Sequence, residues 1–193
     1  MINLATQTIN FENMLKRFSI QSKLILTLLL LFNSTFSQNK INEELTVYFF
    51  IATTCPISQQ YTKEIIRLKE QFKNQGLRII TVFPNNGKKS IKKEIKKFNS
   101  TYELATPFID DKHFKLTKKL KATITPEAFL ISSNGKIIYH GAIDNWYYQL
   151  GKNRINVTAH YLEDAIVEAL QGKSITTSYA EPIGCFIEVS QIK

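Results

Sequence analysis

The chain contains only two cysteines, Cys55 and Cys185, among its 193 residues. Ser58 stands where a Cys-x-x-Cys site would carry its second thiol, and this absence excludes the ordinary redox cycle of such a site. No Cys-x-x-x-Cys pair is present either. Because Cu(I) is preferentially bound by soft thiolates, the sequence gives only weak support for a Cu(I) site. Any reaction at Cys55 therefore needs a partner other than a neighbouring thiol.

The chain also lacks a hydrophobic run that would span a bilayer comfortably, which takes about 20 residues. Its most apolar run, residues 24–32, follows three basic residues and precedes a polar stretch without a stop-transfer cluster. That pattern is typical of a secretory signal peptide, predicted over residues 1–37 with Met14 as an alternative start. We expect an exported protein, periplasmic or secreted, with no stable membrane span after cleavage; a retained anchor is the alternative.

Acidic residues are fewer than basic ones, 16 against 25, which gives a net charge of +9 at pH 7. Lysine pairs are concentrated in residues 88–97, but aromatic side chains do not alternate with them. A solvated helix face explains the lysines best, with an acidic partner or a membrane surface as the alternative. No nucleic-acid partner is expected.

Residues 38–193 contain no internal repeat and no low-complexity linker, and their number suits a single domain. Export would place this domain where disulfides persist. Because the number of cysteines is even, Cys55 and Cys185 have the option of pairing with each other.

The first half of this domain predicts an α/β fold. Residues 44–52 form a nearly continuous apolar and β-branched run, typical of a strand that is covered on both faces. From Pro56 the apolar residues recur at helical spacing as far as residue 72, and Pro56 suits the first helical turn. Residues 77–84 give a second buried strand, so a parallel, right-handed strand–helix–strand unit is expected.

The second half predicts an antiparallel end to the sheet, which makes the sheet mixed. Asn134 and Gly135 separate two alternating apolar runs, the strongest short-range signal for a hairpin. Thr158 is expected to cap a last helix. An irregular loop is expected over residues 144–157. Further elements are expected as helices over 88–98 and 111–120, a short strand over 105–110, and a tail over 173–193.

Cys55 lies where the first buried strand runs into the helix. A helix N-terminus offers unpaired N–H groups and a partial positive charge, which favour the thiolate form of a cysteine. The thiolate is the form that attacks disulfides and peroxides. Cys55 is therefore the predicted nucleophile, and a small buried apolar residue is the alternative interpretation.

Pro126 follows Thr125 at the start of another apolar strand. A cis bond at this proline would place the loop beside Cys55 and leave the backbone of Thr125 free to pair with an extended substrate. The alternative is an ordinary proline at the start of a strand. Thr53 or Thr54 is a candidate hydrogen-bond donor to the thiolate. Thr54 and Asp144 are also expected to contact the substrate, together with Thr125 and Pro126.

The order of these features resembles the thioredoxin-fold superfamily, and most closely the secreted peroxiredoxin-like redoxins with an AhpC/TSA-type domain. The matching segments are Cys-Pro (55–56), Thr-Pro-Glu-Ala-Phe-Leu (125–130), the run from Asn-Gly to Ile-Asp (134–144) and Pro-Ile-Gly-Cys-Phe-Ile (182–187). This resemblance marks Cys55, Pro126, Asp144 and Cys185 as site residues. It implies redox chemistry without a cofactor, on protein or small-molecule disulfides or peroxides, with an unidentified reductant.

The chain also departs from these relatives. True peroxidases of the superfamily carry a threonine three residues before the reactive cysteine, where this chain has Ala52. They also carry a distant arginine, for which Arg154 is the candidate at a different spacing. The resemblance therefore indicates thiol–disulfide exchange or an antioxidant activity through Cys55. Cys185 is either the resolving cysteine or a structural, unpaired thiol of the tail.

Two functions of other classes remain as alternatives. Two thiolates and a histidine would bind Cu(I), as in copper-delivery relatives of the fold, with His113, His140 or His160 as the candidate histidine. A non-catalytic binding module is the other alternative, because a fold that has lost its second active-site thiol can serve such a role.

Overall fold

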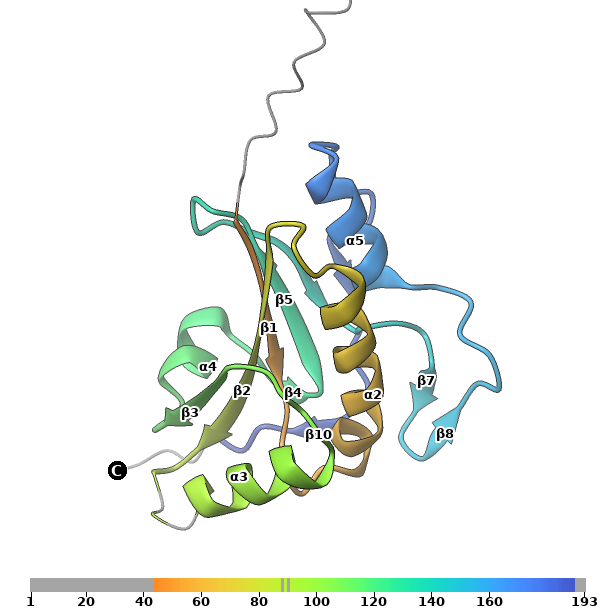
Figure 1. The fold of residues 1–193 in the computed structure, drawn as a ribbon. Helices are drawn as coiled ribbons and strands as arrows, with labels where there is room; N and C mark the ends of the chain where they lie inside the picture. Colours follow the sequence, from red (N-terminus) through yellow and green to blue (C-terminus); the bar gives the residue numbers. More distant parts are fainter. Residues whose placement is uncertain (1–43, 88, 90, 190–193) are drawn as a thin grey trace, which may run out of the picture. The chain divides into compact units, whose positions relative to one another are not determined.

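The computed structural model describes residues 44–87, 89 and 91–189. A six-stranded sheet with the order β3-β2-β1-β5-β6-β9 lies at its centre (Figure 1). Its strands are β1 (Leu45–Phe50), β2 (Leu77–Asn85), β3 (Phe108–Lys112), β5 (Glu127–Ile131), β6 (Ile137–Gly141) and β9 (Tyr179–Ala180). Two smaller pairs accompany it: β4 (Ile124–Thr125) with β10 (Cys185–Phe186), and β7 (Tyr147–Gln149) with β8 (Lys152–Asn153).

The predicted strand–helix–strand unit and the hairpin are both present. β1 and β2 are parallel and are joined by α2 (Pro56–Gln71), whose first residue is the predicted proline. β5 runs antiparallel to both β1 and β6, with the turn at Asn134 and Gly135. The α/β class and the mixed sheet are therefore confirmed.

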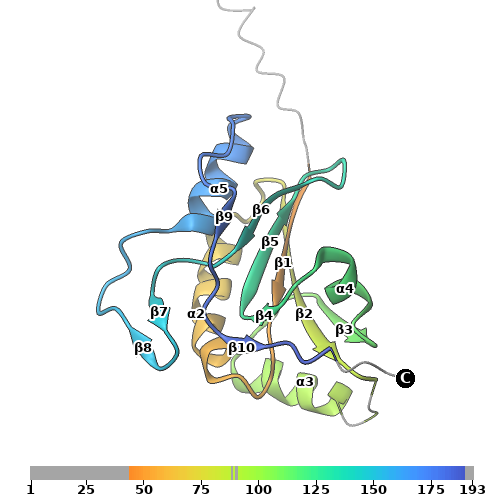
Figure 2. The same ribbon diagram turned by 180° about the vertical axis from the view of Figure 1, so that it is seen from behind.

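Side chains of β1 alternate between two cores, because successive residues of a strand point to opposite faces. Val47 and Phe49 belong to the larger core, which also takes buried residues from α2, α3 (Ile91–Thr101) and α5 (Tyr161–Leu170). Phe50 joins the smaller core with residues around α4 (Lys115–Leu120). Figures 1 and 2 show α4 on the opposite side of the sheet from α2.

Three local predictions are wrong. The segment 144–157 is not wholly irregular, because β7 and β8 form a short hairpin within it. Thr158 does not cap the last helix: α5 begins at Tyr161, and the N–H of Thr158 donates instead to Asn145 Oδ1 at 3.0 Å. The helix expected over 111–120 begins only at Lys115.

The late start of α4 has a clear backbone cause. His113 and Phe114 both have positive φ angles, 60° and 57°, which interrupt a right-handed helix. The carboxylate of Asp111 then accepts the N–H groups of Leu116 and Thr117, at 2.8 and 2.9 Å. The predicted signal peptide over 1–37 lies outside the described residues, among which no helix is long and apolar enough to cross a membrane.

Candidate functional site

Cys55 lies at the junction of β1 and α2, where it is the N-cap residue of the helix. Its backbone carbonyl accepts the N–H of Gln59 at 3.0 Å, while its side chain makes no capping bond. The residue is only 1% exposed. The structure places Cys55 in the predicted position.

Cys185 comes to the same place from the opposite end of the chain. Its Sγ lies 2.9 Å from Cys55 Sγ and donates a hydrogen bond to it. β10, which carries Cys185, pairs antiparallel with β4 so that Cys185 is opposite Thr125. Figure 2 shows β10 running past β4, and the contact between the two sulfurs places it at the first turn of α2. Both sulfurs are free thiols in the structure.

The loop before Pro126 completes the contact. The peptide bond between Thr125 and Pro126 is cis. The thiol of Cys55 donates to the carbonyl oxygen of Thr125 at 3.1 Å, and Thr125 Oγ1 donates to the carbonyl oxygen of Cys185 at 3.3 Å. Thr125 thus contacts both cysteines.

The two thiols have opposite tendencies to ionise. Burial raises the pKa of Cys55, but hydrogen bonds from the Cys185 thiol and from Ser58 more than offset this effect and hold it below the ordinary thiol value. Burial, together with the hydrogen bond to Cys55 and its charge, raises the pKa of Cys185 to about 11. Cys55 therefore ionises first, and Cys185 keeps its proton as a donor to the thiolate.

Ser58 is a functional residue that sequence reasoning treated only as a missing cysteine. It is fully buried in the first turn of α2, and its N–H and hydroxyl groups help to lower the pKa of the Cys55 thiol. Its Oγ also accepts the N–H of Ala52 at 3.3 Å. The Cys-x-x-Ser spacing was the available signal, because this position faces the sulfur from the first helical turn.

Glu127 is the second residue that the sequence did not reveal. Its side chain is buried, and Oε2 accepts the N–H groups of Thr123 and Ile124, at 2.9 and 3.3 Å. Burial raises the pKa of Glu127, and these two donors together with nearby His140 partly oppose that effect. Glu127 therefore fastens the loop that carries Thr125.

Asp144 lies in the structure as an internal acceptor. It is 5% exposed, and its Oδ1 accepts the hydroxyl of Tyr61 at 2.5 Å and the N–H of Trp146 at 2.8 Å. The ring of Tyr61 packs against the rings of Trp146 and Tyr147. Asp144 thus fixes the aromatic segment beside α2, and its role in substrate binding stays a prediction.

Thr54 is exposed next to Cys55. In the part of the chain that the structure describes, the hydrogen bonds to the Cys55 sulfur come from Cys185 and Ser58 rather than from Thr54. A role of Thr54 in binding a substrate also stays a prediction.

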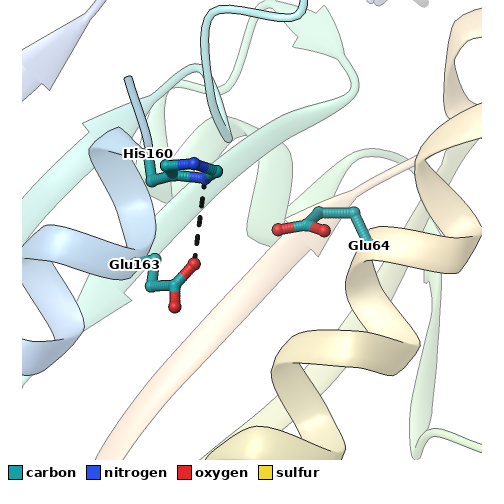
Figure 3. A group of neighbouring side chains, drawn as sticks. All are labelled: Glu64, His160 and Glu163. Carbon is teal, nitrogen blue, oxygen red and sulfur yellow. Dashed lines mark ion pairs between the residues drawn. The ribbon is translucent and has the colours of Figure 1, made fainter. Parts of the chain in front are cut away.

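The histidines of the Cu(I) alternative have other neighbours. His140 stacks on Phe129, and its Nδ1 lies 3.8 Å from Glu127 Oε1. Among the described residues, one cluster has three side chains suited to a metal, and it contains no cysteine: Glu64, His160 and Glu163 (Figure 3). Arg67 already pairs with both of its carboxylates, at 2.6 and 2.5 Å, so this cluster is an ion-pair link between α2 and α5.

Comparison with known proteins now places the chain in a family. A model described as the AhpC/TSA family matches residues 23–140, more than half of the sequence. The chain belongs to the AhpC/TSA family. The matched part contains Cys55, Thr125 and Pro126, whereas Asp144 and Cys185 of this family member lie beyond it.

Solved structures support the same fold for this AhpC/TSA protein. A hypothetical protein from Sinorhizobium meliloti is similar at a TM-score of 0.66 and 23% identity, over 76% of this chain and 80% of that one. An uncharacterized conserved protein from Geobacillus kaustophilus has a TM-score of 0.66 and 22% identity, over 78% and 80%. A thioredoxin-like protein in the oxidized form has a TM-score of 0.51 and 16% identity, over 68% and 80%. No curated protein matches the sequence.

The anchoring of the loop by Glu127 leads to a stability prediction. Glu127→Ala should lower the free energy of unfolding by about 2–6 kcal/mol, because two N–H groups lose their acceptor at about 1–3 kcal/mol each. Glu127→Gln keeps an oxygen at the same place and should lose clearly less. Urea denaturation of both variants measures the difference, and an Ala variant as stable as the wild type would contradict the assignment.

Proposed function

We propose that this AhpC/TSA family member is an exported thiol–disulfide oxidoreductase in which Cys55 is the nucleophile and Cys185 the resolving cysteine. The observation that carries the proposal is the 2.9 Å separation of the two sulfurs, which belong to segments at opposite ends of the domain. The opposite pKa shifts support the assignment of the roles, because the more acidic thiol attacks first.

The reaction has two balanced steps. The thiolate of Cys55 attacks one sulfur of a substrate disulfide, forms a mixed disulfide and releases the first thiolate, which takes up a proton. Cys185 then loses its proton and attacks Cys55 Sγ, which forms the Cys55–Cys185 disulfide and releases the second thiol. Two electrons pass from the pair of cysteines to the substrate, and an external dithiol must return them for turnover.

The residues near Cys55 favour disulfides over peroxides as substrates. Ala52 offers no hydroxyl at the position where peroxidases of the superfamily carry a threonine, and its N–H is engaged by Ser58. Arg154 is exposed and stacks over the ring of Tyr148 at 5.1 Å. Hydroperoxides are therefore the second substrate class, to be compared directly with disulfides.

Substrate contacts and cellular location belong to the same proposal. Thr54 is exposed next to Cys55, which suits it for contact with a bound disulfide. Thr125 and Pro126 are buried, and Thr125 accepts the hydrogen bond of the Cys55 thiol, so these two residues would contact a disulfide that replaces the tail. Export is supported by the signal-peptide pattern over 1–37, which leaves 38–193 as the working domain.

A stoichiometric titration tests the function. The reduced full-length protein receives one equivalent of glutathione disulfide, and a parallel sample receives one equivalent of hydrogen peroxide. We expect two molecules of glutathione released per chain, both protein thiols lost and no glutathione retained, with a slower reaction for peroxide. Two thiols that stay unreactive would overturn the proposal, and stoichiometric Cu(I) binding by such a protein would favour the copper alternative.

A further inference from the structure

The C-terminal tail occupies the edge of β4 as an added strand. Cys185 pairs with Thr125 and Phe186 with Ile124, in antiparallel register. Beyond them, the N–H of Ile187 donates to the carbonyl oxygen of Thr123 at 2.9 Å. The backbone groups next to Cys55 are therefore already paired with the chain's own tail (Figure 2).

Gly184 is required for this close approach. A Cβ atom at position 184 would lie 2.2 Å from the carbonyl oxygen and 2.7 Å from the carbonyl carbon of Thr125. Both are backbone atoms of a loop that Glu127 fastens, so the loop cannot easily move aside. A side chain at position 184 is therefore incompatible with the seated tail.

A second glycine allows the start of the tail to pack closely against β6. A Cβ atom on Gly141 of β6 would lie 1.9 Å from the carbonyl oxygen of Ala180, and the φ angle of Gly141 is +121°. Pro182, which lies between these two contacts in the sequence, is buried. The tail is thus held at two backbone contacts, one on each side of the buried proline.

The seated tail has the features that an extended protein substrate would need. Such a substrate would pair as a strand with the edge of β4 that the tail now occupies, and would place its own cysteine opposite Thr125. Backbone pairing of this kind supplies the affinity in strand addition. Cys185 already holds that position, with its sulfur 2.9 Å from Cys55. A protein substrate and the tail cannot occupy the edge together.

We propose that residues 181–187 compete, as a tethered segment, with protein substrates for the edge of β4 and so restrict Cys55 to small-molecule disulfides. This inference rests on the proposed function. A small disulfide reaches the buried sulfur of Cys55 once the side chain of Cys185 moves aside. A protein disulfide also needs the backbone groups of Thr125, which are free only when the tail leaves β4. A tethered segment reaches an effective concentration on the order of millimolar, far above a micromolar protein substrate. The tail therefore selects the substrate class and also delivers Cys185 for the second step.

Gly184→Val tests the competition, with Glu188→Val as the matched control because Glu188 is an exposed residue of the same tail. The rate of loss of the Cys55 thiol is measured for each reduced full-length protein, with insulin as the protein disulfide and with glutathione disulfide. The readout is the ratio of the two rates, in which any change in the reactivity of the thiolate cancels. Thermal unfolding verifies that each variant is folded.

We expect Gly184→Val to raise the insulin-to-glutathione ratio on the order of 10²-fold, and Glu188→Val to leave it unchanged. A synthetic peptide of residues 181–189 carrying Cys185→Ser, added at millimolar concentration, should lower the raised ratio again. An unchanged ratio in Gly184→Val, with glutathione disulfide still reacting, would overturn the competition alone. Failure of both disulfides to react with any of the proteins would overturn the proposed function together with it.

Discussion

Replacement of Cys55 by serine should abolish disulfide exchange completely. A serine hydroxyl does not ionise near neutral pH, and burial still raises the pKa of the remaining Cys185 thiol, so little of it is thiolate at pH 7. The measurement is the release of glutathione from glutathione disulfide by the reduced variant at pH 7.

Ser58→Ala is the comparison variant, in which disulfide exchange should be slowed rather than abolished. It removes one donor to the thiolate while leaving Cys55 and Cys185 in place, so exchange should be slower but complete. A Cys55→Ser protein that still consumed disulfide at the wild-type rate would show that Cys185 is the nucleophile, which would reverse the assigned roles.

Replacement of Cys185 by alanine should have a different and equally large effect. The first step still takes place at Cys55, but no thiol is present to resolve the mixed disulfide. One glutathione should be released per chain and one retained, and the mass of the protein should rise by that of one glutathione less two hydrogen atoms. Release of both glutathione molecules would exclude Cys185 as the resolving cysteine.

The same variant should also change the pH dependence of Cys55. Loss of the Cys185 thiol removes a donor that favours the thiolate, so the pKa of Cys55 should rise toward the ordinary value. Each unit of that rise lowers the thiolate fraction about tenfold at a pH well below the pKa. The pH profile of alkylation by iodoacetamide, compared with that of the wild type, should therefore have a higher midpoint.

The position of Cys55 is predictable because it depends on local sequence patterns. The apolar run of β1, the change to helical spacing and Pro56 at the first turn each mark one boundary around the cysteine. The hairpin at Asn134 and Gly135 is equally local, since two residues define its turn. These patterns are sufficient for the α/β class and for one member of the thiol pair.

The place of Cys185 is not predictable in this way. β9 and β10 have two residues each, too few for an alternating pattern to be recognised. Their positions depend on pairing with β6 and β4, which are distant in the sequence, and on the close approach that Gly184 permits. The role of Glu127 is hidden for a similar reason, because it depends on which backbone N–H groups the folded chain brings within reach of its carboxylate.

The most direct test of the central claim is a map of the disulfides in the oxidised wild-type protein. The reduced full-length chain is treated with one equivalent of glutathione disulfide, digested without reduction and analysed by mass spectrometry. The two-thiol mechanism predicts a peptide that contains Cys55 linked to a peptide that contains Cys185, in a monomer lighter by two hydrogen atoms and restored by dithiothreitol. Links only between two chains, or two cysteines that remain free to be alkylated, would contradict it.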